Sequence, residues 1–342
     1  MTNPPDRRRI DGGRARRRGV VLPAVLAGVA VAVAIYEQRV LAELDGSPDP
    51  EADARFAFPA EGVHAVATPD GGRLNVEECG SGPPVVLLHG HGANLRIFAP
   101  LAARLAAHGR RVVALDHRGF GRSSEVPPTF GFRGLVDDLA TLLDVLDLRD
   151  AIVAGHSMGG AVALGLAVDR PDVVADRVGA LVLINSSARG PADRPLPRAK
   201  AAALDWSLTE QVGRHPRHGL VLARANFGVD ARRSQVAAAR SIGLGSPAAR
   251  RQGLTRRLLG IDLSDRLGEV RVPVLVLAGA ADRVIRSSES ERIAEALPDA
   301  RLEVFSGAGH MLPMERSAQV ADLILQLAAD APSGRARRAG AP

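Results

Sequence analysis

The residues best suited to chemistry in this 342-residue chain lie at the end of an apolar run. Ser157 stands at the centre of Gly155–Gly159, Gly-His-Ser-Met-Gly. Residues 150–154 are typical of a buried strand, and residues 158–169 of a buried helix. A serine at such a junction takes a strained conformation that needs small neighbours, and the turn lifts its hydroxyl above the sheet edge. The pattern predicts Ser157 as a nucleophile, with the Met158 N–H aimed at the same space.

A nucleophilic serine needs a base, and that base needs an orienting acid. Asp282 follows an expected strand over residues 272–277, and His310 follows a short one over residues 302–305. Both residues come just after the C-terminal end of a strand, where a parallel α/β sheet presents its ligands. The order Ser, Asp, His also fits a serine of this type. The alternative is that Asp282 caps a turn and His310 is a surface loop residue.

A second oxyanion donor is expected upstream. The apolar strand 84–88 runs into His89–Gly92, His-Gly-His-Gly. Glycines allow the backbone to turn sharply, so an N–H near His91 can face a carbonyl oxygen that gains charge, a contact worth about 3–4 kcal/mol of barrier. Taken alone, the segment would be an ordinary Gly-rich turn between a strand and a helix.

Together these motifs resemble the α/β-hydrolase family over residues 63–330. The motifs are His89–Gly92, Asp116–Ser123, Gly155–Gly160 and the Asp282/His310 pair. The resemblance implies that Ser157 is the nucleophile, that His310 is its general base and that Asp282 orients the base. It also implies that the N–H groups of His91 and Met158 form the oxyanion hole.

Two further residues of these motifs are expected to be structural. The resemblance makes the Asp116–Ser123 segment a structural loop after the fourth strand, so Asp116 marks the fold and takes no part in the chemistry. His156, beside the nucleophile, is expected to pack or to form a hydrogen bond.

Alternating strands and helices predict an α/β fold with a mostly parallel central sheet flanked by helices. A hairpin of residues 63–68 and 73–78 opens it. Helices are expected over residues 95–107, 132–146, 158–169, 288–296 and 315–329. The insertion at about 191–262 corresponds to the family's helical cap, and it carries thirteen Arg or Lys against five Asp or Glu. That balance fits either solvated helix faces or attraction to anionic lipids or acidic substrates.

Composition argues against several other classes of protein. The net charge is +6, but Lys200 is the only lysine and aromatic residues make up 3% of the chain. Few side chains are therefore available to stack on bases, and nucleic-acid binding is not expected. Cys79 is the only cysteine, which excludes an intrachain disulfide, and the histidines show no ligand spacing. No metal or other cofactor is expected.

The N-terminus differs in composition from the rest of the chain. Residues 1–18 contain seven arginines, and residues 19–36 carry no charge. A helix of 18 residues spans about 27 Å, close to the minimum for a bilayer core. The arginines predict a single-pass anchor in the cell membrane with the catalytic domain outside. Alternatives are a cleaved signal, which gives a secreted enzyme, and a peripheral segment. Residues 37–61 are expected to be a linker, residues 62–330 the hydrolase domain and residues 331–342 a disordered tail.

The function expected from these features is that of a cofactor-free serine hydrolase. It would act as a carboxylesterase or lipase on small or lipid-like esters through an acyl-enzyme, with the elbow resembling those of monoacylglycerol lipases and small esterases. Short- to medium-chain esters are the expected substrates. One alternative is a cofactor-free haloperoxidase or perhydrolase, and another is a non-catalytic ligand-binding member of the fold. An epoxide hydrolase or dehalogenase is disfavoured because those relatives carry Asp at the nucleophile position.

Overall fold

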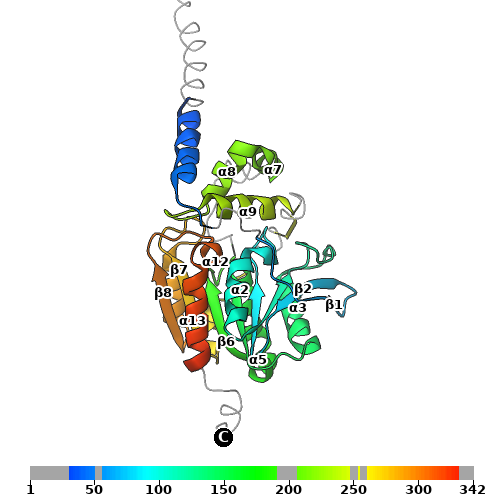
Figure 1. The fold of residues 1–342 in the computed structure, drawn as a ribbon. Helices are drawn as coiled ribbons and strands as arrows, with labels where there is room; N and C mark the ends of the chain where they lie inside the picture. The colour runs from blue at the N-terminus through cyan, green and yellow to red at the C-terminus, as the bar shows by residue number, and fades with distance from the viewer. Residues whose placement is uncertain (1–30, 51–55, 191–205, 247–252, 255–259, 331–342) are drawn as a thin grey trace, which may run out of the picture. The chain divides into compact units, whose positions relative to one another are not determined.

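Eight strands form one sheet at the centre of the fold (Figure 1). The computed structural model describes residues 31–50, 56–190, 206–246, 253–254 and 260–330. The sheet order is β1-β2-β4-β3-β5-β6-β7-β8. β1 and β2 pair antiparallel, as do β2 and β4, and every other pair is parallel. The strands are β1 Gly62–Ala67, β2 Arg73–Cys79, β3 Pro84–Leu88, β4 Arg111–Asp116, β5 Ala151–His156, β6 Val178–Ile184, β7 Val274–Gly279 and β8 Ala300–Phe305.

The central strands are apolar throughout because helices cover both of their faces. Every residue of β5 and of β7 is buried. At the edge of the sheet, half of the residues of β1 are exposed and a single one, Val66, is buried. The mostly parallel sheet predicted from the sequence is confirmed.

Helices lie on both faces of the sheet. α2 Ala99–Ala107 and α13 Ser317–Asp330 pack together on one face, in front of the sheet in Figure 1. A continuous apolar core joins the other face to the remaining flanking helices. These are α3 Phe132–Val145, α4 Met158–Asp169, α5 Pro171–Arg177 and α11 Ser287–Ala296, with the 3₁₀ turn η3 Ser264–Glu269.

Proline accounts for three differences from the predicted helices. The helix expected over residues 95–107 divides into a 3₁₀ turn, η1 Leu95–Phe98, and α2, which has a proline in its first turn. The helix expected to start at residue 315 is preceded by the short α12 Leu312–Glu315, which also has a proline in its first turn. α5 was not predicted, and it starts at Pro171. Proline lacks an N–H and has a fixed φ, so it favours the first turn of a helix.

Three of the described helices between β6 and β7 lie in the region expected to form the cap. They are α7 Trp206–Arg214, α8 Pro216–Arg224 and α9 Arg233–Leu244, which lie together at one end of the sheet (Figure 1). Residues 191–205 of the expected cap lie outside the described residues.

The N-terminal unit has one described element, a helix over residues 31–46. Helix therefore continues into the first part of the segment expected to be a linker. Residues 37–45 lack Gly and Pro and mix charged residues with Val, Leu and Ala, a composition that suits a helix until Gly46 and Pro48. Among the described residues, no helix is both long and apolar enough to cross a bilayer. Residues 19–30 of the predicted anchor lie outside the described residues.

Candidate active site

Ser157 lies on a strained turn between β5 and α4. Its backbone has φ 53° and ψ −117°, a conformation that side-chain-bearing residues rarely adopt. The Ser157 N–H donates to the Ile184 carbonyl at 2.9 Å, and the Ser157 carbonyl accepts from the Ser186 hydroxyl at 2.8 Å. The last residue of β6 and the loop that follows it thus bind both backbone polar groups of Ser157. Strain of about 1–3 kcal/mol that is fixed in this way is typical of functional positions.

Close packing explains why small residues surround the serine. A Cβ on Gly155 would lie 2.3 Å from the Gly159 carbonyl, and a Cβ on Gly159 would lie 2.1 Å from the Leu88 carbonyl oxygen. Neither distance leaves room for a side chain. The start of α4 therefore packs directly against the end of β3, and the side chain of Ser157 is left partly exposed.

Asp282 and His310 meet at the same edge of the sheet. The His310 Nδ1 donates to the Asp282 Oδ2 at 2.7 Å, and the two side chains are 9% and 0% exposed. The other carboxylate oxygen accepts the N–H groups of Val284 and Ile285 at 2.7 and 2.9 Å. Burial works to raise the pKa of Asp282, but the hydrogen bond and charge of His310, with further donors, hold that pKa below its usual value. Asp282 is therefore an ionised partner for the imidazole.

The nucleophile strand is tied to His310 through the adjacent histidine. The His156 Nε2 donates to the His310 carbonyl at 2.7 Å, and the two rings lie 4.8 Å apart. Because Asp282 occupies Nδ1 of His310, Nε2 is the ring nitrogen left to serve Ser157. Within the described part of the chain, the Ser157 hydroxyl forms no hydrogen bond to this ring. Such contacts often tighten only when substrate binds.

The loop expected to carry an oxyanion donor lies against Ser157. A Cβ on Gly90 would be 3.0 Å from the Ser157 Cβ, so the backbone of the loop reaches the nucleophile. Met158 is the first residue of α4, and its N–H has no acceptor within the helix. The structure thus brings the backbone that precedes His91 next to Ser157, which itself directly precedes α4. The role of both N–H groups as donors stays a prediction.

His89 fixes this loop, a role that the sequence did not reveal. Its Nδ1 donates to the Gly90 carbonyl at 2.7 Å, and its Nε2 accepts the N–H of His117 at 2.9 Å. Burial lowers the pKa of His89, although the nearby charge of Asp116 acts to raise it. A neutral imidazole with its proton on Nδ1 satisfies both contacts.

A buried glutamate, also missed from the sequence, joins the His310 loop to the cap. The Glu315 carboxylate accepts the N–H of Gly309 at 3.0 Å and that of Gly228 at 2.8 Å. In addition, the His310 N–H donates to the Asn226 carbonyl at 2.8 Å. Burial raises the pKa of Glu315 although these N–H groups oppose the shift. The base is thus held by the segment that links α8 to α9.

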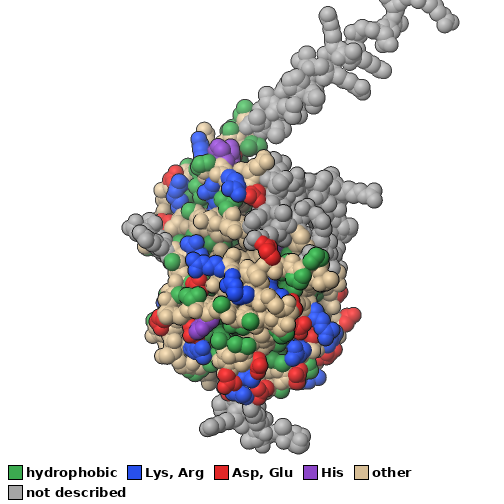
Figure 2. All heavy atoms as spheres, turned by 90° about the vertical axis from the view of Figure 1, so that its right-hand side faces the viewer, with side chains coloured by type: hydrophobic (Ala, Val, Ile, Leu, Met, Phe, Trp, Pro, Cys, Tyr) green, Lys and Arg blue, Asp and Glu red, His purple; other side chains and the backbone are tan. Residues whose placement is uncertain are grey.

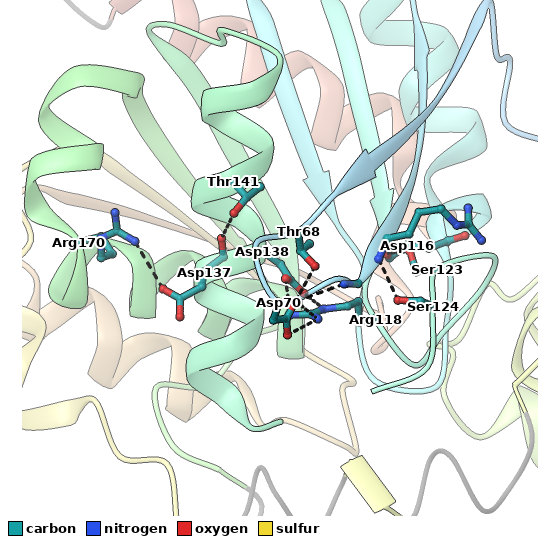
Figure 3. Close-up of polar contacts among 12 residues, drawn as sticks. Thr68, Asp70, Asp116, Arg118, Ser123, Ser124, Asp137, Asp138, Thr141 and Arg170 are labelled. Carbon is teal, nitrogen blue, oxygen red and sulfur yellow. Dashed lines mark hydrogen bonds and ion pairs between the residues drawn. The ribbon is translucent and has the colours of Figure 1, made fainter. Parts of the chain in front are cut away.

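The Asp116–Ser123 loop has the structural role that was expected of it. The Asp116 carboxylate accepts the side chain of Asn75 and the N–H groups of Leu95 and Arg122, at 2.8–3.0 Å. In the same loop, Arg118 pairs at 2.7 Å with both Asp70 and Asp138 (Figure 3). These contacts join the β1–β2 turn to α3.

A surface hollow of about 670 Å³ adjoins this ion-pair cluster. Asp70, Arg118 and Asp138 line it, and none of the predicted catalytic residues does. Burial raises the pKa of Asp138 to about 6, although Arg118 acts to lower it.

On the face shown in Figure 2, basic side chains lie among acidic ones. Within the described ranges, no group of three or more His, Cys, Asp or Glu side chains is arranged to hold a metal ion.

Three buried histidines make the fold sensitive to acid. Burial lowers the pKa of His156 to about 3, and it also lowers the pKa values of His89 and His117 from the ordinary 6.5. The unfolded chain therefore binds more protons than the fold as the pH drops below about 6.5, so stability falls. Each such histidine lowers the free energy of unfolding by up to about 1.4 kcal/mol for each pH unit of acidification.

Replacing His117 by leucine should reduce this sensitivity. Both ring nitrogens of His117 are buried without a hydrogen-bond partner among the described residues, so the substitution removes a titrating group and breaks no polar contact of the ring there. Urea unfolding between pH 7.5 and 5 should show a variant whose stability declines less steeply, by about 1.4 kcal/mol per pH unit in the acid range. If the free energy of unfolding declines with falling pH equally steeply in the variant and in the wild type, this explanation is wrong.

Comparisons with known proteins agree with the fold. Residues 83–317 match the family model for the alpha/beta hydrolase fold. The chain is 34% identical over 238 residues to a protein of Caulobacter sp. (strain K31) described as a carbamate hydrolase, RutD, covering 66% of this chain and 83% of that protein. An esterase from Exiguobacterium antarcticum superposes with a TM-score of 0.68 at 25% identity, covering 77% of this chain and 97% of that one.

A third relative matches over a shorter stretch. It is described as a non-heme haloperoxidase of Mycobacterium phage D29, and it is 39% identical over 119 residues, which are 35% of this chain and 41% of that protein. The extent of the family match and the RutD likeness establish the class. This chain belongs to the α/β-hydrolase family.

Proposed function

We propose that this protein is a serine hydrolase that cleaves carboxylic esters through an acyl-enzyme. The observation that carries the proposal is the strained Ser157 turn beside the buried His310–Asp282 pair. Ser157 attacks the acyl carbonyl while His310 takes the hydroxyl proton, and the bond to the alcohol then breaks as His310 passes that proton to the departing alcohol oxygen. His310 next takes a proton from the water that attacks the acyl-enzyme, and it returns this proton to the Ser157 oxygen as the acid is released. Asp282 holds the imidazole in the tautomer that leaves Nε2 free to accept this proton.

The oxyanion formed in each step requires donors placed in advance. The N–H of Met158 and that of His91 are the proposed pair, one at the start of α4 and one in the loop after β3. A donor of this kind lowers the barrier by about 3–4 kcal/mol. No step in this sequence requires a metal or an organic cofactor.

We further propose short- to medium-chain acyl groups as the preferred substrates. A helical cap excludes polymers from Ser157, and pockets for small molecules are largely apolar. Each buried CH₂ contributes up to about 0.8 kcal/mol, so kcat/KM should rise with acyl length until the pocket is full. The esterase from Exiguobacterium antarcticum supports the ester class.

A series of p-nitrophenyl esters from acetate to palmitate tests both points. We expect turnover without added cofactor and a maximum at short or medium chain length. The same preparation is given amides, carbamates, and peroxide with a halide, since relatives are described as a carbamate hydrolase and a haloperoxidase. Carbamate cleavage or halogenation that exceeds ester hydrolysis would overturn the ester assignment, and a flat chain-length profile would remove the acyl pocket.

For the N-terminal segment we propose a membrane anchor with the catalytic domain on the outer side. The support is the seven arginines before residues 19–36, together with the exposed side chains of Val31, Val33, Ile35 and Tyr36. Protease added to spheroplasts should remove the hydrolase domain, and deletion of residues 1–43 should release active enzyme into the soluble fraction. A mature N-terminus near Ile35 would show a cleaved signal instead.

A further inference from the structure

Asn185 is a buried polar residue at the catalytic edge of the sheet that the proposed chemistry does not use. It directly follows β6, and its backbone N–H donates to the Leu277 carbonyl of β7 at 2.8 Å. Its φ is +46°, a left-handed conformation that asparagine tolerates better than most residues. The residue is 1% exposed. The ends of two strands therefore fix where its side chain can reach.

The amide of Asn185 contacts both halves of the acid–base pair. Its Nδ2 donates to the Asp282 Oδ2 at 2.6 Å and to the Gly309 carbonyl at 2.9 Å. Gly309 immediately precedes His310 in the chain. One side chain thus joins the carboxylate to the backbone that carries the imidazole, across 97 and 124 residues of sequence.

The orientation of this amide is determined by its surroundings. Rotation by half a turn would place Oδ1 against a carboxylate oxygen and a carbonyl oxygen, both of which only accept hydrogen bonds. In the orientation observed, Oδ1 is buried and has no hydrogen-bond partner in the part of the chain that the structure describes. A buried acceptor left without a donor is unfavourable, so the two Nδ2 bonds must decide the arrangement.

With this donor in place, the Asp282 carboxylate has no freedom to turn. One oxygen receives the N–H groups of Val284 and Ile285, and the other receives His310 and Asn185 together. We propose that Asn185 is a positioning residue of the catalytic triad, which holds Asp282 and the His310 loop in the geometry that orients the imidazole. This inference rests on the proposed serine-hydrolase function. The other titratable groups near the pair are His156, which bonds the His310 carbonyl, and Glu315, which bonds the Gly309 N–H.

Two substitutions at Asn185 separate its donor from its backbone conformation. Asn185→Asp keeps the size and the tolerance of positive φ but sets a second carboxylate against Asp282. Asn185→Gly keeps the backbone and removes the donor. Asn75→Asp is the matched control, because the buried Asn75 Nδ2 donates at 3.0 Å to the Asp116 carboxylate, outside the triad. Circular dichroism establishes that each variant is folded.

The pH dependence of kcat/KM on the preferred p-nitrophenyl ester is the first readout. In the Asn185→Asp variant, kcat/KM at pH 7 should fall at least about tenfold. The acid limb of its pH profile, where kcat/KM declines as His310 becomes protonated, should move up by about one pH unit, because added negative charge favours the protonated imidazole. Asn185→Gly should move the limb in the same direction by less. In Asn75→Asp the limb should stay where it is in the wild type.

NMR titration of the His310 ring is the second readout, and it does not depend on activity. Its apparent pKa should be higher in Asn185→Asp than in the wild type and unchanged in Asn75→Asp. If the wild type hydrolyses esters and the acid limb and ring titration of Asn185→Asp coincide with it, the positioning role is overturned. If the wild type hydrolyses no ester, the proposed function fails, and the ring titration alone decides the role of Asn185.

Discussion

Replacing Ser157 by alanine is expected to lower the rate of ester hydrolysis by roughly a thousandfold or more. The substitution removes the atom that attacks the carbonyl, and the oxyanion donors and the binding site retain only a small residual rate. Stability should hardly change. The hydroxyl makes no hydrogen bond within the described part of the chain, and alanine keeps the Cβ that the turn already accommodates. Initial rates on the preferred p-nitrophenyl ester, with thermal unfolding in parallel, measure both effects.

Ser187→Ala is the control for this experiment. Ser187 is a nearby hydroxyl in the loop after β6, where it accepts the Arg189 N–H at 3.1 Å, and it has no part in the proposed chemistry. Its replacement should leave turnover near the wild-type value. A Ser157→Ala enzyme with more than about one hundredth of wild-type turnover would show that another residue is the nucleophile.

Asp282→Asn is expected to have the second largest effect, a loss on the order of a thousandfold in kcat. The Val284 and Ile285 N–H groups would hold the amide oxygen, so the new NH₂ would point at Nδ1 of His310. Nδ1 must then accept a hydrogen bond from this NH₂, so the ring proton of the neutral imidazole moves to Nε2. A proton on Nε2 prevents His310 from taking the proton of the Ser157 hydroxyl. The NH₂ would also face the donor of Asn185. Some activity should remain, because Ser157 and the oxyanion donors are untouched.

Asp116→Asn provides the comparison for a buried carboxylate outside the triad. The Asp116 carboxylate at the end of β4 accepts three donors, one each from Asn75, Leu95 and Arg122. Its substitution should lower the unfolding temperature while the folded fraction keeps its kcat. Equal losses of kcat in the two variants would show that Asp282 acts through stability alone.

Local patterns were enough to predict the elbow. Strand β5 and helix α4 are apolar segments that adjoin in the sequence, and the glycines on either side of Ser157 stand where a Cβ would have no room. The residue types of this short stretch are therefore those that the turn requires. Asp282 and His310 were predictable because each comes soon after a strand, Asp282 after the buried β7 and His310 after the edge strand β8. Parallel strands end at a common edge, and the register pairs Gly279 of β7 with Phe305 of β8, which brings the two following loops together.

Contacts between distant segments were not predictable in this way. Asn185 looked like one polar loop residue among several, and only the fold places it beside Asp282 and Gly309. Glu315 was expected only as the first residue of a helix, but its carboxylate is buried against the Gly228 and Gly309 N–H groups. These partners lie 87 and 6 residues away, and no periodic pattern encodes such pairs.

Labelling with a fluorophosphonate tests the central claim most directly. This reagent phosphonylates a serine only when a neighbouring base activates it, so the reaction requires the turn and the His310–Asp282 pair to act together. We expect one adduct per chain, located by peptide mass spectrometry on Ser157, with loss of ester hydrolysis in the same proportion. Reaction at a different serine, or full ester hydrolysis by protein that takes up no label, would contradict the account.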